Sequence, residues 1–163
     1  MSFHIPPNPH ATIASSIDQS IANVALAQVI TFDTTIAANG ITLVSGSRIT
    51  LPQPGNYSFA VSAVAAAVGA ANAKQVSMWF RKNGTDVANS NTYLTVNKDP
   101  TIIAVVLDLP CTVAGDWYEI WWSGETTGVK MDAVAAVPGT LPATFPPAQP
   151  ASPSIILTIG QIG

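Results

Sequence analysis

Apolar and polar residues alternate over short stretches of the chain, and turn-forming residues separate these stretches. In residues 57–64, the large side chains of Tyr57 and Phe59 alternate with the small side chains of Ser58 and Ala60. Side chains alternate between the two faces of a strand, so this pattern predicts a strand with one large and one small face. Runs rich in β-branched and aromatic residues predict further strands at 24–34, 41–51, 76–82, 85–88, 92–96 and 101–109.

Glycine-containing dipeptides mark the expected turns. Asn39-Gly40 and Asn83-Gly84 suit the positive φ angles of tight turns, and the second is the stronger hairpin signal. The alanine-rich segment 65–73 has the composition of a helix. It contains Gly69 and lies between predicted strands, so we interpret it as the end of a strand followed by a loop.

Residues 116–122 carry bulky aromatic side chains on both predicted faces. Alternation places Trp117, Glu119 and Trp121 on one face and Tyr118, Ile120 and Trp122 on the other. A two-layer β-sandwich buries only one face of each strand in its core. The apolar segments 101–109 and 154–161 have the same two-sided pattern. We therefore expect another subunit to cover part of these strands, or the last strand to lie inside a sheet.

The 163 residues suit a single domain with one core. We expect residues 1–23 to form an extended N-terminal arm and residues 24–163 to form the domain. This domain would include a return segment at 138–153, where six prolines prevent regular strand pairing, and a terminal strand at 154–162. The N-terminus does not have the pattern of a secretory signal, so we expect the mature protein to start near Met1.

Charged residues make up 9% of the chain, against about 25% in ordinary globular proteins. Apolar residues make up 48%, and the mean hydropathy is +0.35. No apolar run approaches the ~18 residues of a membrane-spanning helix, so we expect no membrane association. The net charge is −3 and no basic run is longer than two residues, which argues against nucleic-acid binding. Contact with other protein chains best explains this apolar surface.

The sequence offers little for catalysis or for cofactor and metal binding. His4 and His10 lie in the predicted arm, far in sequence from Cys111, so no nucleophilic triad is indicated. The single cysteine excludes an internal disulfide, and we expect it to be buried. Asp116 and Glu119 fall on opposite faces of their strand, which suits a turn residue and a partner for a basic side chain. We expect a non-enzymatic protein with no catalytic residue, cofactor or metal.

Four short motifs with turn-forming residues follow one another along the chain. They are Asn39-Gly40-Ile41, Pro54-Gly55-Asn56-Tyr57-Ser58-Phe59, Lys82-Asn83-Gly84, and Leu109 to Trp117 with Gly115-Asp116. This ordered set resembles the C1q/TNF-like jelly-roll family. The resemblance implies an all-β, antiparallel β-sandwich of the jelly-roll type and a homotrimer around a threefold axis.

The C-terminal segment differs from that family, and with the low charge it resembles small virion proteins of tailed bacteriophages. Such proteins include trimeric capsid decoration (cement) proteins and the tips of head or tail fibres, so this second resemblance implies a homotrimer in either role. Of the two we expect a homotrimeric capsid decoration (cement) protein that binds the major capsid protein and stabilises the phage head. The protein would be made in the host cytoplasm and would lie on the outer capsid surface of the virion. The short segment before the first predicted strand favours this role over a fibre tip.

The alternative is an adhesion module at a head-fibre or tail-fibre tip that binds a glycan or a receptor. Trp117, Trp121 and Trp122 could stack on sugar rings, and the loop 89–91 could supply hydrogen bonds, although packing is the more common role of such residues. Subunit contacts are expected at Tyr57, Phe59, Tyr118, Trp121, Trp122, Ile155, Leu157 and Ile159. Capsid contacts are expected at Phe3, His4, Ile5 and Phe145.

Overall fold

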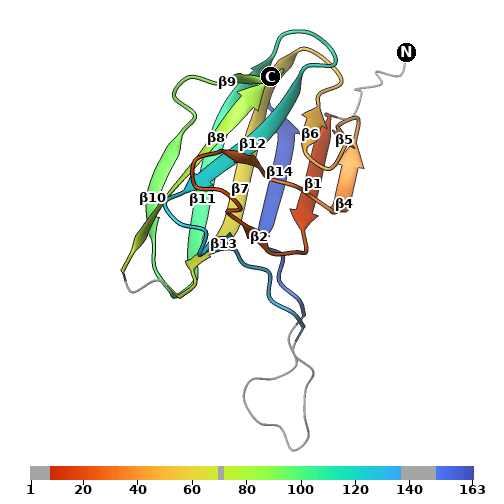
Figure 1. Cartoon of the computed structure of the whole chain (residues 1–163). Coiled ribbons are helices and arrows are strands. Elements are labelled where there is room, and N and C mark those ends of the chain that lie inside the picture. The colour runs from red at the N-terminus through yellow and green to blue at the C-terminus, as the bar shows by residue number, and fades with distance from the viewer. Residues whose placement is uncertain (1–7, 70–71, 137–149) are drawn as a thin grey trace, which may run out of the picture.

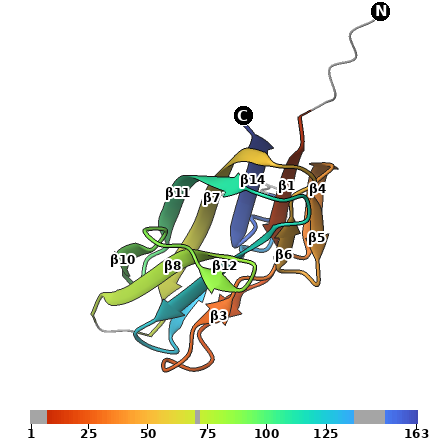
Figure 2. The same cartoon turned by 90° about the horizontal axis from the view of Figure 1, so that it is seen from above.

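The structure is a computed structural model of the chain and describes residues 8–69, 72–136 and 150–163. Two antiparallel sheets pack face to face, and Figure 1 shows their strands running along the long axis of the molecule. The view from above separates the two layers (Figure 2). We name each sheet after its central strand, the β7 sheet and the β12 sheet. The all-β, antiparallel sandwich predicted from the sequence is confirmed.

The β7 sheet is built around the longest strand of the described chain. Its members are β1 (His10–Ser15), β2 (Gln19–Ser20), β4 (Thr34–Asn39), β7 (Gly55–Ala67), β11 (Thr101–Cys111), β13 (Val129–Met131) and β14 (Ile155–Gln161). β7 pairs with β11 along one side, and β11 is an edge strand. On its other side β7 pairs with β14, which pairs with β1, which pairs with β4. The last strand of the chain therefore lies inside the sheet.

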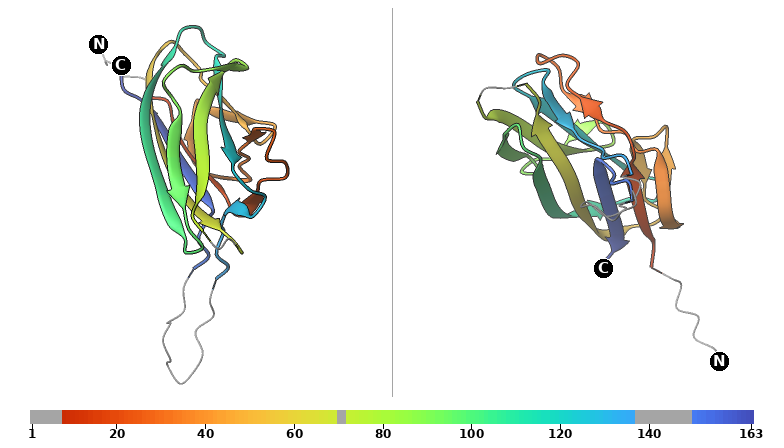
Figure 3. Two further views of the ribbon diagram at one scale, coloured as in Figure 1. Left: turned by 60° about the vertical axis from the view of Figure 1, so that its left-hand side comes forward. Right: turned by 90° about the horizontal axis from the view of Figure 1, so that it is seen from below.

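The β12 sheet carries the aromatic segment. Its members are β3 (Gln28–Val29), β5 (Thr42–Val44), β6 (Arg48–Thr50), β8 (Lys74–Lys82), β9 (Thr85–Asp86), β10 (Thr92–Val96) and β12 (Trp117–Gly124). The main order is β10, β8, β12, β6 and β5, while β3 pairs with β12 and β9 pairs with β8. β10 lies at one edge, beside β8. The two layers are also visible from the side (Figure 3).

Alternating side chains from the two sheets form one core. On β7 the large residues predicted to share a face, including Tyr57 and Phe59, point inward and are fully buried. The Phe59 ring meets Phe80 of β8 edge-on at 5.5 Å between ring centres, and it meets Tyr118 of β12 at 5.2 Å. The two-face pattern predicted for β12 is also confirmed, because Tyr118, Ile120 and Trp122 are buried in this core.

The turns form where the sequence predicts them. Asn83 and Gly84 have φ angles of 50° and 83°, so both central residues of the β8–β9 hairpin adopt the positive values of a type I′ turn. Gly55 has a φ of 147°, and a Cβ there would overlap the side chain of Gln161 and the carbonyl of Gly163. The close approach of the C-terminal strand therefore requires glycine in the Pro-Gly-x-Tyr motif.

The prediction of one continuous strand over residues 24–34 is wrong. The chain forms only the short β3 there, crosses to the other layer, and begins β4 at Thr34. The side chain and amide of Ser16 both donate hydrogen bonds to Asp33, which hold the crossing against the end of β1. The apolar side chains of Ile30 and Phe32 are buried in this connection rather than in a ladder.

The prediction of an extended arm over residues 1–23 is wrong in part. Residues 10–15 form β1, which lies between β14 and β4 with its side chains at 11 and 13 in the core. Alternation of Ala11, Thr12 and Ile13 gives this short segment one apolar face, which is enough to join the sheet. Of the proline-rich return, residues 150–153 are described, and Ser152 forms an isolated bridge with Val134; the rest lies outside the described residues.

Candidate functional site

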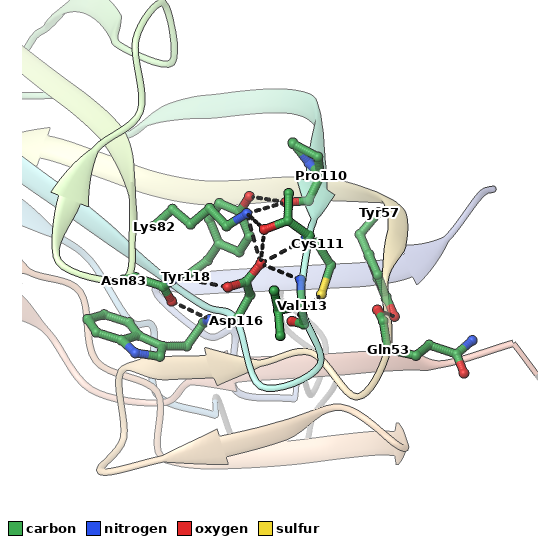
Figure 4. Close-up of polar contacts among 11 residues, drawn as sticks. Gln53, Tyr57, Lys82, Asn83, Pro110, Cys111, Val113, Asp116 and Tyr118 are labelled. Carbon is green, nitrogen blue, oxygen red and sulfur yellow. Dashed lines mark hydrogen bonds and ion pairs between the residues drawn. The ribbon is translucent and has the colours of Figure 1, made fainter.

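Asp116 lies at the meeting point of two turns (Figure 4). Its Oδ1 accepts a hydrogen bond of 2.8 Å from Asn83, and its Oδ2 lies 2.9 Å from the Lys82 ammonium. The same Oδ2 accepts hydrogen bonds from the amide and hydroxyl of Thr112 and from the amide of Val113, at 2.7, 2.8 and 3.1 Å. The Lys-Asn-Gly motif and the Gly-Asp motif are thus one joined unit of structure.

Burial alone would raise the pKa of Asp116, but hydrogen bonds from Lys82, Asn83 and Thr112 outweigh it and hold the pKa well below the usual range. The carboxylate therefore stays ionised, and its lone pairs are already committed to hydrogen bonds. Such a group is a poor general base, since proton transfer would break the contacts that stabilise its charge. Its geometry is that of a structural anion.

Two further polar groups near Asp116 are also poor catalysts. Cys111 is buried, and burial followed by the nearby charge of Asp116 raises the pKa of its thiol. The thiol donates a 3.1 Å hydrogen bond to the carbonyl of Val113. The Tyr118 hydroxyl donates a 2.7 Å hydrogen bond to the carbonyl of Pro110, and burial raises its pKa. A neutral, donating thiol is not an activated nucleophile.

Glu119 lies on the outward face of β12, as alternation predicts. Its carboxylate accepts hydrogen bonds from Ser47 at 3.2 Å, Arg48 at 3.3 Å and the Trp121 indole at 3.0 Å. The pairing with a basic side chain expected from the sequence is present. Asp116 and Glu119 are engaged in separate networks and do not face one common substrate position.

Within residues 8–69, 72–136 and 150–163, no three His, Cys, Asp or Glu side chains are grouped to hold a metal ion. His10 is exposed, and its Nδ1 lies 3.0 Å from the carbonyl of Asn8. No helix in the described chain is long and apolar enough to cross a membrane.

The outward face of the β7 sheet is poor in charge along its central strands. Three of its seven strands, β7, β11 and β14, present mainly Ala, Ser, Thr, Val and Ile, and among their described outward residues only Asp108 is charged. The largest apolar groups on the edge strand β11 are Ile102 and Val106, which are 71% and 69% exposed. An isolated chain leaves these side chains in water, which is the signature of a protein contact surface.

The outward face of the β12 sheet has a different chemistry. Three of the four tryptophans lie here: Trp79 on β8, and Trp117 and Trp121 on β12. Trp79 is directly opposite Trp121 across the two strands. The Arg81 guanidinium lies 4.0 Å from the centre of the Trp121 ring, and that of Arg48 lies 4.5 Å from the Trp117 ring. This face combines partly exposed aromatic rings with fixed polar groups.

Most of the residues expected to form subunit contacts lie in the core of the single chain. Seven of the eight are buried in the core of a single chain, with relative exposures of 0–1%: Tyr57, Phe59, Tyr118, Trp122, Ile155, Leu157 and Ile159. A side chain that its own fold already covers cannot contact another subunit. Trp121 is partly exposed on the outward face of β12. The capsid-contact candidates Phe3, His4, Ile5 and Phe145 lie outside the described residues.

Sequence reasoning missed Trp79 and Asp86 as surface residues of interest, and within the two-sided segment 101–109 it did not single out Ile102 and Val106. The signal for Trp79 was available: Val76, Met78 and Phe80 alternate with it and form the buried face of the same strand. Ile102 and Val106 gave a weaker signal, because the continuous apolar run of β11 does not say which face lacks a cover.

No family model and no curated protein matches the sequence. Solved structures do match. The crystal structure of murine APRIL at pH 5.0 aligns with a TM-score of 0.57 and 7% identity over 95% of this chain and 99% of that chain. The globular domain of zebrafish complement 1qA protein aligns with a TM-score of 0.50 and 10% identity over 95% and 98%. The fold is a C1q/TNF-like jelly roll.

This similarity covers nearly all of the chain, and at such low identity it concerns the fold alone. It confirms the fold expected from the four motifs. In this jelly roll, two of those motifs form the Asp116 network, and a third places Gly55 against the C-terminal strand.

Proposed function

We propose that the protein is a non-enzymatic, homotrimeric virion protein that decorates the outer surface of a phage capsid and stabilises it. The trimer is inferred from the outward face of the β7 sheet, where Ile102 and Val106 are exposed on the edge strand. A face of small and β-branched residues with little charge can pack closely against a second protein surface. The occupant of this face would be another copy of the same chain.

The fold supports the same assembly, since C1q/TNF-like domains usually form homotrimers. Association would remove Ile102 and Val106 from water. Each Å² of apolar area buried in this way stabilises the assembly by about 25 cal/mol. The low charge of the face leaves few ionic groups to desolvate, because Asp108, which pairs with Ser58, is the one charged residue among the described outward residues of β7, β11 and β14.

The virion role rests on the resemblance to phage decoration proteins and on the 9% charge content of the chain. A trimer offers three copies of each contact, so weak contacts with the major capsid protein would combine into stable binding. Phe3, His4, Ile5 and Phe145 are the proposed capsid contacts, and the protein would be made in the host cytoplasm before it joins the virion.

Two measurements test this function. Light scattering of the purified protein should give about three times the chain mass of 16.9 kDa. Incubation with undecorated phage heads should produce bound protein and a higher temperature of head disruption. A stable monomer at micromolar concentration would refute the trimer. A trimer that neither binds heads nor stabilises them would refute the decoration role and leave the assembly intact.

Adhesion to a glycan or a receptor is the second candidate. A separate observation favours it: the outward face of the β12 sheet carries partly exposed tryptophans next to polar loops. Binding on this face is compatible with the proposed trimer, because the β7 sheet contact would lie on the other side of the sandwich (Figure 2).

A further inference from the structure

A hollow of about 350 Å³ opens on the outward face of the β12 sheet beside Trp79. Its lining comes from β8, β9, β12 and the connection between β9 and β10: Ser77, Trp79, Asp86, Val87, Asn89, Asn91 and Ser123. One aromatic ring therefore stands among hydroxyl, carboxamide and carboxylate groups. Apolar rings bind the C–H face of a sugar, while such polar groups bind its hydroxyls.

Asp86 fixes the position of the Trp79 ring. Its Oδ1 accepts a 2.8 Å hydrogen bond from the indole Nε1 and is also bound by Arg81. These two donors, Arg81 first, lower the pKa of Asp86, so the carboxylate that holds the ring stays ionised at neutral pH. Arg81 in turn lies over Trp121. The aromatic platform is thus held in place without a ligand, which reduces the entropy cost of binding.

The loop that carries the two asparagines is also anchored. Ser90 between them is buried; its hydroxyl donates a 2.8 Å hydrogen bond to the Val87 carbonyl and accepts one of 3.0 Å from the Phe80 amide. Asn89 and Asn91 are exposed on either side, and within the described residues their carboxamides make no hydrogen bond to the protein. Both amides are therefore available to a ligand.

A second hollow, of about 250 Å³, continues from the first. The two share Ser77 and Ser123, and Tyr93, which is 60% exposed, lines the second. Tyr93 pairs with Ser77, two residues along β8 from Trp79, so the two aromatic residues are diagonal neighbours roughly 7–8 Å apart. Two aromatic residues on neighbouring strands of one face suit consecutive units of an oligosaccharide.

We propose that this groove is a binding site for a neutral oligosaccharide, with one sugar ring stacked on Trp79 and its hydroxyls hydrogen-bonded to Asn89 and Asn91. The next sugar unit lies toward Tyr93. The ligand is neutral because the two carboxylates that line the groove are already paired, Asp86 with Arg81 and Glu125 with Lys74, and the other lining side chains carry no charge. This proposal rests on the adhesion candidate and does not depend on head binding.

The test uses the full chain against an array of neutral oligosaccharides and bacterial polysaccharides, followed by titration of tryptophan fluorescence with lactose, maltose, cellobiose and chitobiose. Trp79→Ala should weaken binding about tenfold or more through loss of the stacking platform. Asn89→Gly and Asn91→Ala together should weaken it as well. Glycine at position 89 tolerates the φ of 62° and removes the side chain with its carboxamide.

Trp117→Ala is the matched control, since this tryptophan lies on the same face outside the hollow and should bind like the wild type. Far-ultraviolet circular dichroism and the scattering mass check that each variant is folded and assembled. Binding lost in the Trp79 and asparagine variants alone supports the site. No binding to any sugar, or equal binding by wild type and all variants, overturns it; head stabilisation measured in parallel reports separately on the decoration role.

Discussion

Asn83 and Asp116, which are 33 residues apart in the chain, are joined by a 2.8 Å hydrogen bond from the Asn83 Nδ2 to the Asp116 Oδ1. The Oδ1 of the same asparagine accepts a 2.9 Å bond from the amide of Trp117. The hairpin after β8 and the turn before β12 therefore hold each other in position. Tight-turn geometry explains the Asn-Gly pair, and this contact explains why the aspartate follows Gly115.

Asp116→Ala should strongly destabilise the fold. The substitution leaves the amides of Thr112 and Val113 without their acceptor and Lys82 without its partner carboxylate. Removing one member of such a buried ionic network costs about 3–5 kcal/mol. Urea unfolding at one fixed protein concentration measures this loss.

The exposed Asp99→Ala is the matched control, and its free energy of unfolding should stay within about 0.5 kcal/mol of the wild type. A loss below about 1 kcal/mol in Asp116→Ala would mean that the two turns are held together by other contacts.

The contribution of Asp116 should also depend on pH. Its pKa in the folded protein is lower than the ordinary value of 3.8, so the unfolded chain binds a proton before the folded one does. The stabilisation is thus fully present above about pH 4 and is lost as the pH falls further. The stability difference between wild type and Asp116→Asn should be largest at neutral pH and should shrink below pH 4.

Chemical unfolding at a series of pH values from neutral to about pH 2 measures this difference. Asp18, Asp33 and Asp86 also have lowered pKa values, but they are present in both proteins and cancel. A difference that stays constant, or that grows in acid, would contradict an ionised Asp116 in the folded state.

The regular part of the fold could be predicted because its strands are long and bury one face. In β7, β8 and β12 the inward residues differ clearly from the outward ones, so period-two alternation identifies both strand and face. The failures lie in short segments. β1 is six residues long within a region containing several prolines, and Ile30 and Phe32 are buried by a connection that looks like a strand in the sequence.

The candidate contact surfaces were harder to predict, for a physical reason. Apolarity predicts that a residue such as Trp122 or Leu157 is buried, but it does not say whether the same chain or another chain covers it. The layer arrangement settles this, since the neighbouring sheet covers both residues. The groove at Trp79 needs residues from three segments, and only the pairing of β8 with β12 and the fold of the loop after β9 bring them together.

Val106→Lys should separate the proposed trimer into monomers without unfolding it. Val106 is 69% exposed in the single chain, so lysine fits there in the monomer. In the trimer the ammonium groups would be buried without partners, which costs several kcal/mol per charge. Light scattering should then give about 16.9 kDa, with an unchanged circular dichroism spectrum.

Thr95→Lys provides the control, because Thr95 is exposed on β10 and faces outward from the other sheet. It should remain a trimer. If Val106→Lys stays trimeric while Thr95→Lys dissociates, the β12 sheet rather than the β7 sheet forms the subunit contact.

Trp121 and Trp122 are neighbours in the chain with opposite surroundings, and their alanine variants should differ accordingly. Trp122 is 1% exposed and lies in the core, so Trp122→Ala should lower the free energy of unfolding by about 3–5 kcal/mol. Trp121 is half-buried on the outward face, where its alanine variant loses the contact with Arg81, the hydrogen bond to Glu119 and packing beside Trp79, so Trp121→Ala should cost about 1–2 kcal/mol. Urea unfolding at equal protein concentrations compares the two variants directly. Equal losses would contradict the different surroundings of the two residues, and dissociation of the trimer by Trp122→Ala without loss of chain stability would place Trp122 at a subunit contact.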